Sequence, residues 1–126
     1  MKALNIIESG YRATLEEQDD TIVWITHAMK GAGADLDVLL RGNAVNYLVQ
    51  GQDASGLSFG NENQTQPPQL AQDIAKLVEK GVTVYATEED LQDRGIANAD
   101  LVQGVERISR AATAGILDNY DQVWHW

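Results

Sequence analysis

Residues 70–90, LAQDIAKLVEKGVTVYATEED, decide the fold. Apolar residues recur at helical spacing in the first half of this stretch, namely Leu70, Ile74, Leu77 and Val78. Gly81 is typical of the end of a helix, and the β-branched run at residues 82–87 predicts a strand. Three acidic residues follow and favour the first turn of another helix. Helix, strand and helix joined by short links are the repeating unit of a parallel α/β sheet.

The same alternation extends towards both ends of the chain. The pattern predicts strands at residues 2–9, 36–40, 82–87, 105–109 and 122–126. It predicts helices at residues 21–33, 44–49, 67–81, 88–95 and 110–120, although residues 44–49 also fit an extension of the preceding strand. Parallel strands need crossovers, which place helices on both faces of the sheet. We therefore expect one α/β domain over residues 1–126, a three-layer α/β/α sandwich around a mainly parallel sheet of about five strands with flavodoxin-like topology.

The composition restricts the chemistry. Cysteine is absent from the 126 residues, which excludes disulfides, thiolate metal sites, thiol nucleophiles and persulfide carriage by this chain. The formal net charge is −10, with 19 acidic against nine basic side chains, and such a surface repels nucleic acids and anionic membranes. The sequence has no signal-peptide pattern and no apolar run of about 18 residues, so we expect a cytoplasmic protein.

Candidate ligand contacts lie where the strands end, because open parallel sheets bind ligands at the carboxyl ends of their strands. These candidates are Ser9, Gly10, Arg41, Gly42, Asn43, Thr87 and Arg110. The two arginines could hold a small anion or a nucleotide phosphate, together with backbone N–H groups at helix starts. The sequence contains neither GxGxxG nor a P-loop ending, so no cofactor is predicted.

Other reactive residue types form no recognisable catalytic set. His27 and His125 lack metal-ligand spacing, so no metal site is predicted, and each fits a hydrogen-bonded structural histidine. No serine lies in a GxSxG context. Residues 88–90 are acidic, which fits a helix N-terminus better than paired-carboxylate catalysis.

The segment at residues 51–66, GQDASGLSFGNENQTQ, is too long for an ordinary connection. It is interpreted as a lid, an oligomer contact or a disordered loop. The chain also closes on VWHW, where a strand would point both indoles to one face. These indoles either fold back over the core or fill a contact between subunits. The candidate interface residues are Tyr47, Phe59, Trp124 and Trp126.

The order of several segments resembles the DsrE/DsrF-like family, which includes the sulfur-relay subunits of the Tus and Dsr systems. The matching segments are AMKGAGADLDVLLRGNAV at residues 28–45, LAQDIAKLVEKGVTVYAT at 70–87, DRGI at 93–96 and ADLVQGVERIS at 99–109. The pattern covers nearly the whole chain, and its specificity lies in the order and spacing of the segments. The resemblance implies a DsrE-like fold and an assembly into trimers or hexamers.

The sulfur-carrying relatives use a cysteine directly after the strand that begins GVxV. By register, the resemblance places that position at Thr87. A hydroxyl cannot carry a persulfide, so sulfur transfer by this chain alone is excluded. Relay assemblies also contain structural subunits without a working cysteine, and the resemblance therefore implies an assembly or binding role.

Three functions follow as hypotheses. The first is a non-catalytic DsrE-like module that self-associates and docks a protein partner or a small ligand. The second is a small-anion or nucleotide-binding protein that uses Arg41, Gly42, Asn43 and Arg110. The third is an enzyme with a non-thiol mechanism at Thr87, Glu88 and the loop of residues 55–66.

Overall fold

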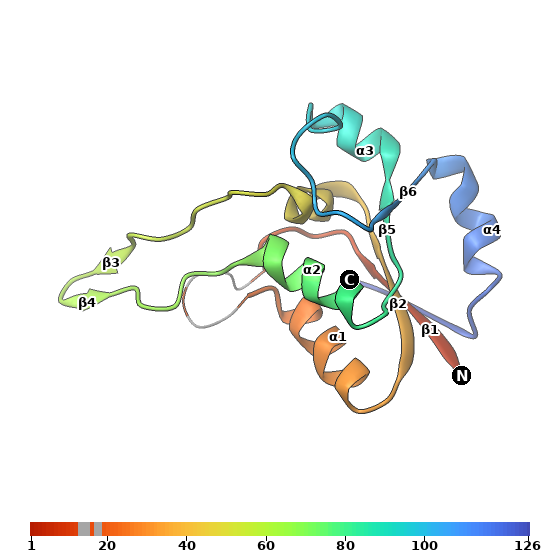
Figure 1. Ribbon diagram of the computed structural model, residues 1–126, viewed down its shortest axis with the longest axis horizontal. Coiled ribbons are helices and arrows are strands. Elements are labelled where there is room, and N and C mark those ends of the chain that lie inside the picture. Colours follow the sequence, from red (N-terminus) through yellow and green to blue (C-terminus); the bar gives the residue numbers. More distant parts are fainter. Residues whose placement is uncertain (13–15, 17–18) are drawn as a thin grey trace.

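The computed structural model describes residues 1–12, 16 and 19–126 (Figure 1). A five-stranded sheet runs through its centre in the order β6-β5-β2-β1-β7, and all four pairings are parallel. The strands of this sheet are β1 (Lys2–Ile7), β2 (Asp35–Leu40), β5 (Val84–Thr87), β6 (Glu106–Ile108) and β7 (Gln122–His125). The predicted three-layer α/β fold with a parallel sheet is confirmed.

The direction of the crossovers determines which face each helix covers. From β1 through β2 and β5 to β6 the chain steps one way across the sheet, and then it returns to place β7 on the far side of β1. Right-handed crossovers therefore put α1 (Thr21–Gly31), α2 (Leu70–Glu79) and α3 (Glu88–Asp93) on one face and α4 (Thr113–Leu117) on the other (Figure 1). Two 3₁₀ helices, η1 (Gly42–Leu48) and η2 (Arg110–Ala112), complete the elements of the body.

The strand order differs from the flavodoxin order 2-1-3-4-5. Counted along the chain, the five strands of the sheet lie in the order 4-3-2-1-5. The reversal of direction therefore falls between β1 and β7. This is the topological switch point, where open α/β sheets form a crevice.

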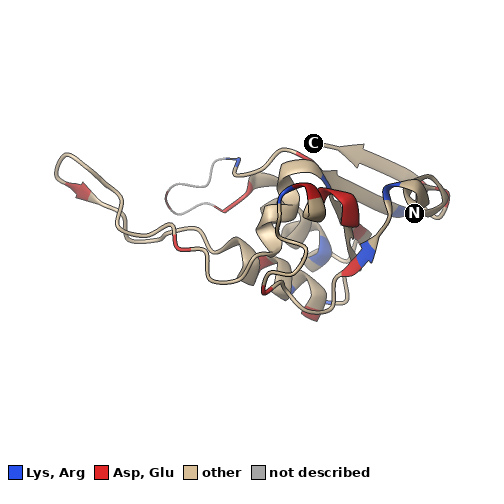
Figure 2. Cartoon of the chain, turned by 90° about the horizontal axis from the view of Figure 1, so that it is seen from above, with Lys and Arg blue, Asp and Glu red and all other residues tan. Residues whose placement is uncertain are grey.

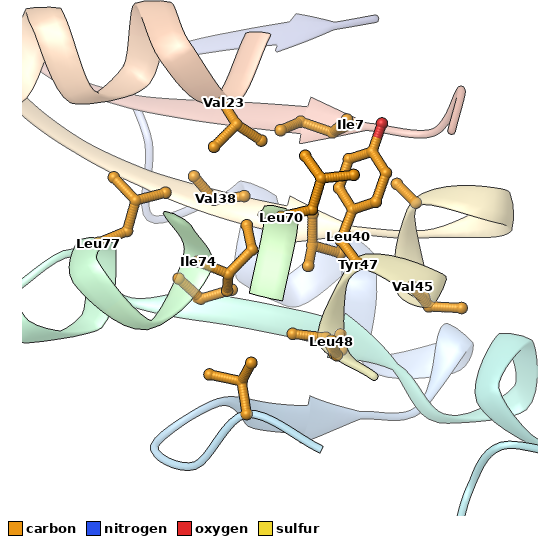
Figure 3. Close-up of a cluster of buried hydrophobic side chains, with 14 of the residues drawn as sticks. Ile7, Val23, Val38, Leu40, Val45, Tyr47, Leu48, Leu70, Ile74 and Leu77 are labelled. Atoms are coloured by element: carbon orange, nitrogen blue, oxygen red, sulfur yellow. The ribbon is translucent and has the colours of Figure 1, made fainter. Parts of the chain in front are cut away.

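The main core lies between the sheet and the helices α1, α2 and η1 (Figure 3). The predicted face of α2 supplies Leu70, Ile74 and Leu77, which are buried against Val38 and Val84 of the strands. A smaller cluster on the other face joins Leu4, Ile6 and Leu39 to side chains near α4. The two helical layers thus differ in size, and the layer with the five-residue helix α4 is the smaller one.

Several predicted bounds differ from the observed ones. The helix expected over residues 110–120 is a 3₁₀ turn followed by the short α4, because Gly115 lies at its centre and lowers helix propensity. The strands expected at 82–87 and 105–109 are shorter, and residues 44–48 belong to η1 rather than to an extended strand, whereas Val49 follows η1 with an extended backbone. The polar connection expected before α1 includes residues 13–15 and 17–18, which lie outside the described residues.

Residues 51–66 form an arm that projects from the body (Figures 1 and 2). Its outer end is a hairpin of β3 (Ser58–Phe59) and β4 (Glu62–Asn63), joined by a two-residue turn. Gly60, the first residue of the turn, has a φ of +59°, whereas the φ of Asn61 is not positive. This pattern is typical of a type II′ turn, whose twist matches that of hairpin strands. The long polar segment thus projects from the body and contains a short hairpin.

Candidate functional site

Thr87, where the resemblance places a sulfur-carrying cysteine, lies at the carboxyl end of β5. Thr87 is the residue before α3, and only 3% of it is exposed. Its side chain makes no capping hydrogen bond to the helix. Thr87 therefore presents neither a thiol nor an accessible hydroxyl at the strand tip.

Asp90 organises the strand tips around Thr87. Its Oδ2 accepts a hydrogen bond from the backbone N–H of Gly42, 2.8 Å away, which ties the end of β2 to α3. Its Oδ1 accepts a bond of 2.9 Å from Arg110 Nη2, at the end of β6. Arg94 reaches across to Asn43, donating to Oδ1 over 2.8 Å. One carboxylate thus gathers the ends of three strands that the sequence analysis had treated separately.

The predicted anion-binding arginines already have acidic partners. Arg41 Nη2 lies 3.6 Å from a carboxylate oxygen of Glu8, and Arg110 pairs with Asp90. Nearby, Arg107 donates two hydrogen bonds to Glu88, and these bonds lower the pKa of the Glu88 carboxyl. The structure thus brings the predicted strand-tip residues together at one edge, but it surrounds their positive charges with carboxylates. Anion binding there stays a prediction that this geometry does not favour.

The crevice at the switch point is filled by the chain itself. The backbone N–H groups of Glu8 and Ser9 donate to the carbonyl oxygen of Trp126, over 3.0 and 3.4 Å. His125 Nε2 lies 2.6 Å from a carboxylate oxygen of Glu8. Gly10 packs so closely on Asn43 that an added Cβ would lie 3.1 Å from its carbonyl oxygen. The backbone N–H groups of Glu8 and Ser9, which lie where other open sheets bind a ligand, are therefore hydrogen-bonded to another part of this chain.

The candidate interface residues separate into three environments. Tyr47 is wholly buried in the core, so its predicted place on a surface is wrong. Trp126 folds back over the sheet, where its Nε1 donates to Asn5 Oδ1 over 3.3 Å, yet 42% of it stays exposed. Trp124 is partly buried in the edge strand β7, and Phe59 is 64% exposed near the tip of the arm.

Two grooves lie away from the strand tips. One, of about 440 Å³, sits at the base of the arm between Tyr11, residues 50–54 and residues 67–72. The phenol of Tyr11 donates to Gln52 there, over 2.6 Å. The other, of about 630 Å³, lies between α1 and α2. It is lined by Asp19, Thr21, Val23, Trp24, His27, Asp73, Lys76 and Lys80.

The groove between α1 and α2 contains a connected set of titratable side chains. His27 Nε2 lies 2.9 Å from the carbonyl oxygen of Asp73, and its Nδ1 lies 2.9 Å from Lys80 Nζ. Burial and the neighbouring lysines Lys80 and Lys76 lower the pKa of His27, so the ring is neutral at pH 7. A neutral ring with Nε2–H donating to the carbonyl and Nδ1 accepting from the ammonium satisfies both contacts.

Asp73 is the most perturbed acid of this set. Its Oδ2 is buried and accepts no hydrogen bond from a donor among the described residues. Burial, followed by a side-chain hydrogen bond to Asp19, raises the pKa of Asp73 to about 8. A hydrogen bond between two carboxyl groups requires a proton on one of them, and the raised pKa of Asp73 places that proton on Asp73 at pH 7. Among the described residues, no three histidine and acidic side chains converge as a metal site requires.

This raised pKa predicts a pH dependence of stability. The pKa of the Asp73 carboxyl is about 8 in the folded protein, above its ordinary value of 3.8, so the folded state binds more protons between these two pH values. The contribution of Asp73 to the free energy of unfolding therefore falls as the pH rises from about 4 to about 8. We expect Asp73→Asn to flatten the decline in the free energy of unfolding between pH 5 and pH 8, measured by urea denaturation. The control Asp118→Asn, at an exposed position, should keep the wild-type slope. An unchanged slope in Asp73→Asn would contradict the raised pKa.

Sequence reasoning missed this groove because its parts are far apart in the chain. Trp24 and His27 are three residues apart on α1, and Lys76 and Lys80 are four apart on α2. Each pair was visible as a helical surface pattern. Only the packing of α1 against α2 shows that the two patterns face one groove.

The fold and the strand tip define a class of protein: a three-layer α/β/α domain with a buried threonine at the tip of β5. The sequence profile of the DsrE/DsrF-like family matches residues 1–125, and the chain belongs to this family. No curated protein matches the sequence.

Solved structures share the fold. The YchN protein from E. coli superposes with a TM-score of 0.74 at 20% identity and covers all of both chains. BT1422 from Bacteroides thetaiotaomicron, a conserved protein of unknown function, has a TM-score of 0.68 at 14% identity over 98% of this chain and 94% of its own. MTH1491 from Methanobacterium thermoautotrophicum, also of unknown function, has a TM-score of 0.60 at 16% identity over 98% of this chain and 96% of its own. At these identities the similarity concerns the fold alone.

No helix in the described part of the chain combines the length and the apolar character needed to cross a membrane.

Proposed function

We propose that this protein is a non-catalytic DsrE-like subunit that assembles into a homo-oligomer, a trimer or a hexamer, and acts by binding rather than by chemistry. The arm at residues 51–66 carries this proposal. A role in binding agrees with the strand tip, where Thr87 is buried and the chain contains no cysteine. The assembly would present its surfaces to a protein partner or a small ligand.

The arm is a surface that needs a partner. Residues 58–63 are all exposed, and the hairpin has only two paired positions on each strand. Isolated two-stranded hairpins are marginal in water, so this one gains little stability from its own chain. Between residues 54 and 66 the sequence has one charged side chain, Glu62, in a protein of net charge −10 (Figure 2). A nearly uncharged surface with an exposed aromatic ring is typical of the centre of a protein interface.

Phe59→Ser tests the assembly. Phe59 would fill a pocket of a neighbouring subunit, and loss of such an aromatic anchor costs about 2–4 kcal/mol per contact, a weakening of roughly 30-fold or more. We expect wild-type protein to sediment as an oligomer at micromolar concentration and Phe59→Ser to sediment as a monomer. Sedimentation velocity provides the mass, and circular dichroism checks that the monomer is folded.

The matched control is Asn61→Ser, in the turn of the same hairpin. Both residues are exposed in the single chain, so neither change should unfold it. Asn61→Ser should leave the mass unchanged. A wild-type protein that is monomeric at 50–100 µM would overturn the proposal, as would a Phe59→Ser variant with the wild-type mass.

A further inference from the structure

The groove between α1 and α2 is distinct from the strand tips and from the arm. Its volume of about 630 Å³ lies within the range of small-molecule sites. No strand-tip candidate and no residue of the arm lines it. A role for this groove is therefore independent of the proposed assembly through the arm.

Trp24 provides an exposed aromatic surface in this groove. The residue is 65% exposed, although α1 buries Ile22 and Val23 against the sheet. An indole in water at the wall of a groove offers a large flat surface to a planar molecule. Its exposure has no role in the packing of the helix, because the buried face of α1 is on the other side.

The opposite wall provides positive charge. Lys76 of α2 and Lys80, which directly follows the last turn of α2, lie four residues apart. Within the described residues neither ammonium group has a carboxylate in salt-bridge range. The arginines Arg41, Arg107 and Arg110 all have such partners. Among the described residues, the one polar side-chain contact of these two ammonium groups is that of Lys80 Nζ with His27 Nδ1, and the ring of His27 is neutral. They form the positive wall of the groove.

The remaining polar groups make the groove selective. His27 is held between the carbonyl of Asp73 and Lys80, so its ring has a fixed position and offers no positive charge. Asp73 is protonated and Asp19 accepts from the backbone N–H of Gln69 over 3.0 Å. With Asp73 neutral, the two lysines outweigh the single charge of Asp19. The groove therefore has a net positive charge.

We propose that the groove between α1 and α2 binds a small organic anion with a planar aromatic ring, the ring on Trp24 and the anionic group between Lys76 and Lys80. The ligand class is an aromatic carboxylate or sulfonate. The ring contact and the charge contact come from different helices, so a molecule that has only one of the two features uses only half of the site.

Isothermal titration calorimetry of the full chain at pH 6.5 tests this proposal with three probes. Naphthalene-2-sulfonate has both features, naphthalene-2-methanol has the ring alone, and methanesulfonate has the charge alone. We expect the first to bind at least about tenfold more tightly than either of the others. Equal affinity of the two naphthalene probes would overturn the charge contact, and absence of binding by naphthalene-2-sulfonate at 5 mM would overturn the site.

Two variants and their matched controls locate the binding. Trp24→Ala and Lys76→Gln should each weaken naphthalene-2-sulfonate about 3–10-fold, in line with the loss of one aromatic or one charged contact. Ile25→Ala is the control for the first, because Ile25 is exposed on the same helix but does not line the groove. Lys30→Gln, with the same change of charge at the end of α1, is the control for the second. Equal losses in variants and controls would overturn the proposal.

The pH dependence gives an independent readout. Asp73 is faced by Asp19, by His27 of α1 and by Lys76 and Lys80 of α2. Above pH 8 its carboxylate adds a second negative charge, so we expect naphthalene-2-sulfonate to bind more weakly at pH 9 than at pH 6.5. Asp73→Asn should bind equally at both values. A mass change in Trp24→Ala, seen by sedimentation, would show instead that a neighbouring subunit covers the groove, and it would overturn the proposal.

Discussion

Replacing Asp20 by alanine is expected to lower the free energy of unfolding by about 2–5 kcal/mol, because one buried carboxylate holds three donors. Asp20 is wholly buried, and its Oδ1 accepts from the backbone N–H groups of Ile22 and Val23 over 2.8 and 3.0 Å, which caps α1. Its Oδ2 accepts from the phenol of Tyr47 over 2.5 Å. That phenol in turn accepts from the backbone N–H of Tyr11, 2.5 Å away.

Two costs add up in Asp20→Ala. Loss of an N-cap costs about 1–2 kcal/mol, and a buried hydroxyl left without its acceptor costs about 1–3 kcal/mol. Urea denaturation monitored by circular dichroism measures the sum as a shift in midpoint at constant slope. Asp20→Asn is the graded control, since its carbonyl can still cap the helix, and it should lose about half as much. A loss below 1 kcal/mol in Asp20→Ala would show that the cap and the phenol contact are dispensable.

Installing a cysteine by Thr87→Cys is expected to give a thiol that reacts at least about 100-fold more slowly with a disulfide reagent than an exposed one. Only 3% of Thr87 is exposed, which blocks approach to the sulfur. The first turn of α3 also contains three acids, Glu88, Glu89 and Asp90, and nearby negative charge disfavours the thiolate that reacts. The strand tip therefore lacks the surroundings of a reactive thiol as well as the sulfur itself.

The rate of reaction with 5,5′-dithiobis(2-nitrobenzoate) measures this difference. Ser109→Cys is the comparison, because Ser109 also lies between a strand and a helix but is exposed. Both variants should react at the same rate in 8 M urea, where burial is lost. Equal rates in buffer would show that the tip of β5 opens in solution and would contradict the burial of position 87.

The elements with strong local signals were predictable. The spacing of Leu70, Ile74 and Leu77 defines the buried face of α2, and Gly81 ends that helix region at φ +84°. The alternation of strands and helices also defined the layers, because crossovers between parallel strands leave few other arrangements. The alternation did not define the order of the strands within the sheet. The position of β7 beside β1, rather than at the other edge, depends on packing between residues more than a hundred positions apart.

The site was less predictable than the fold, for a related reason. Arg41 and Arg110 were visible at strand ends, but their pairing with Glu8 and Asp90 depends on neighbouring strand tips. Asp90 itself was interpreted only as a favourable charge in the first turn of a helix. Its bond to the N–H of Gly42 links positions 48 residues apart and leaves no trace in local spacing.

The place of β7 in the sheet has a consequence for the order in which the protein forms. Lys2 and Asp121 are 119 positions apart in the sequence, so the pairing of β7 with β1 closes a longer loop than the other three strand pairings of this sheet. Because β7 lies at an edge of the sheet and pairs with β1 alone, it gains backbone bonds on one side only for that entropic cost. The other four strands can assemble without it, and amide hydrogen exchange should therefore find β7 the first strand to open and the last to close.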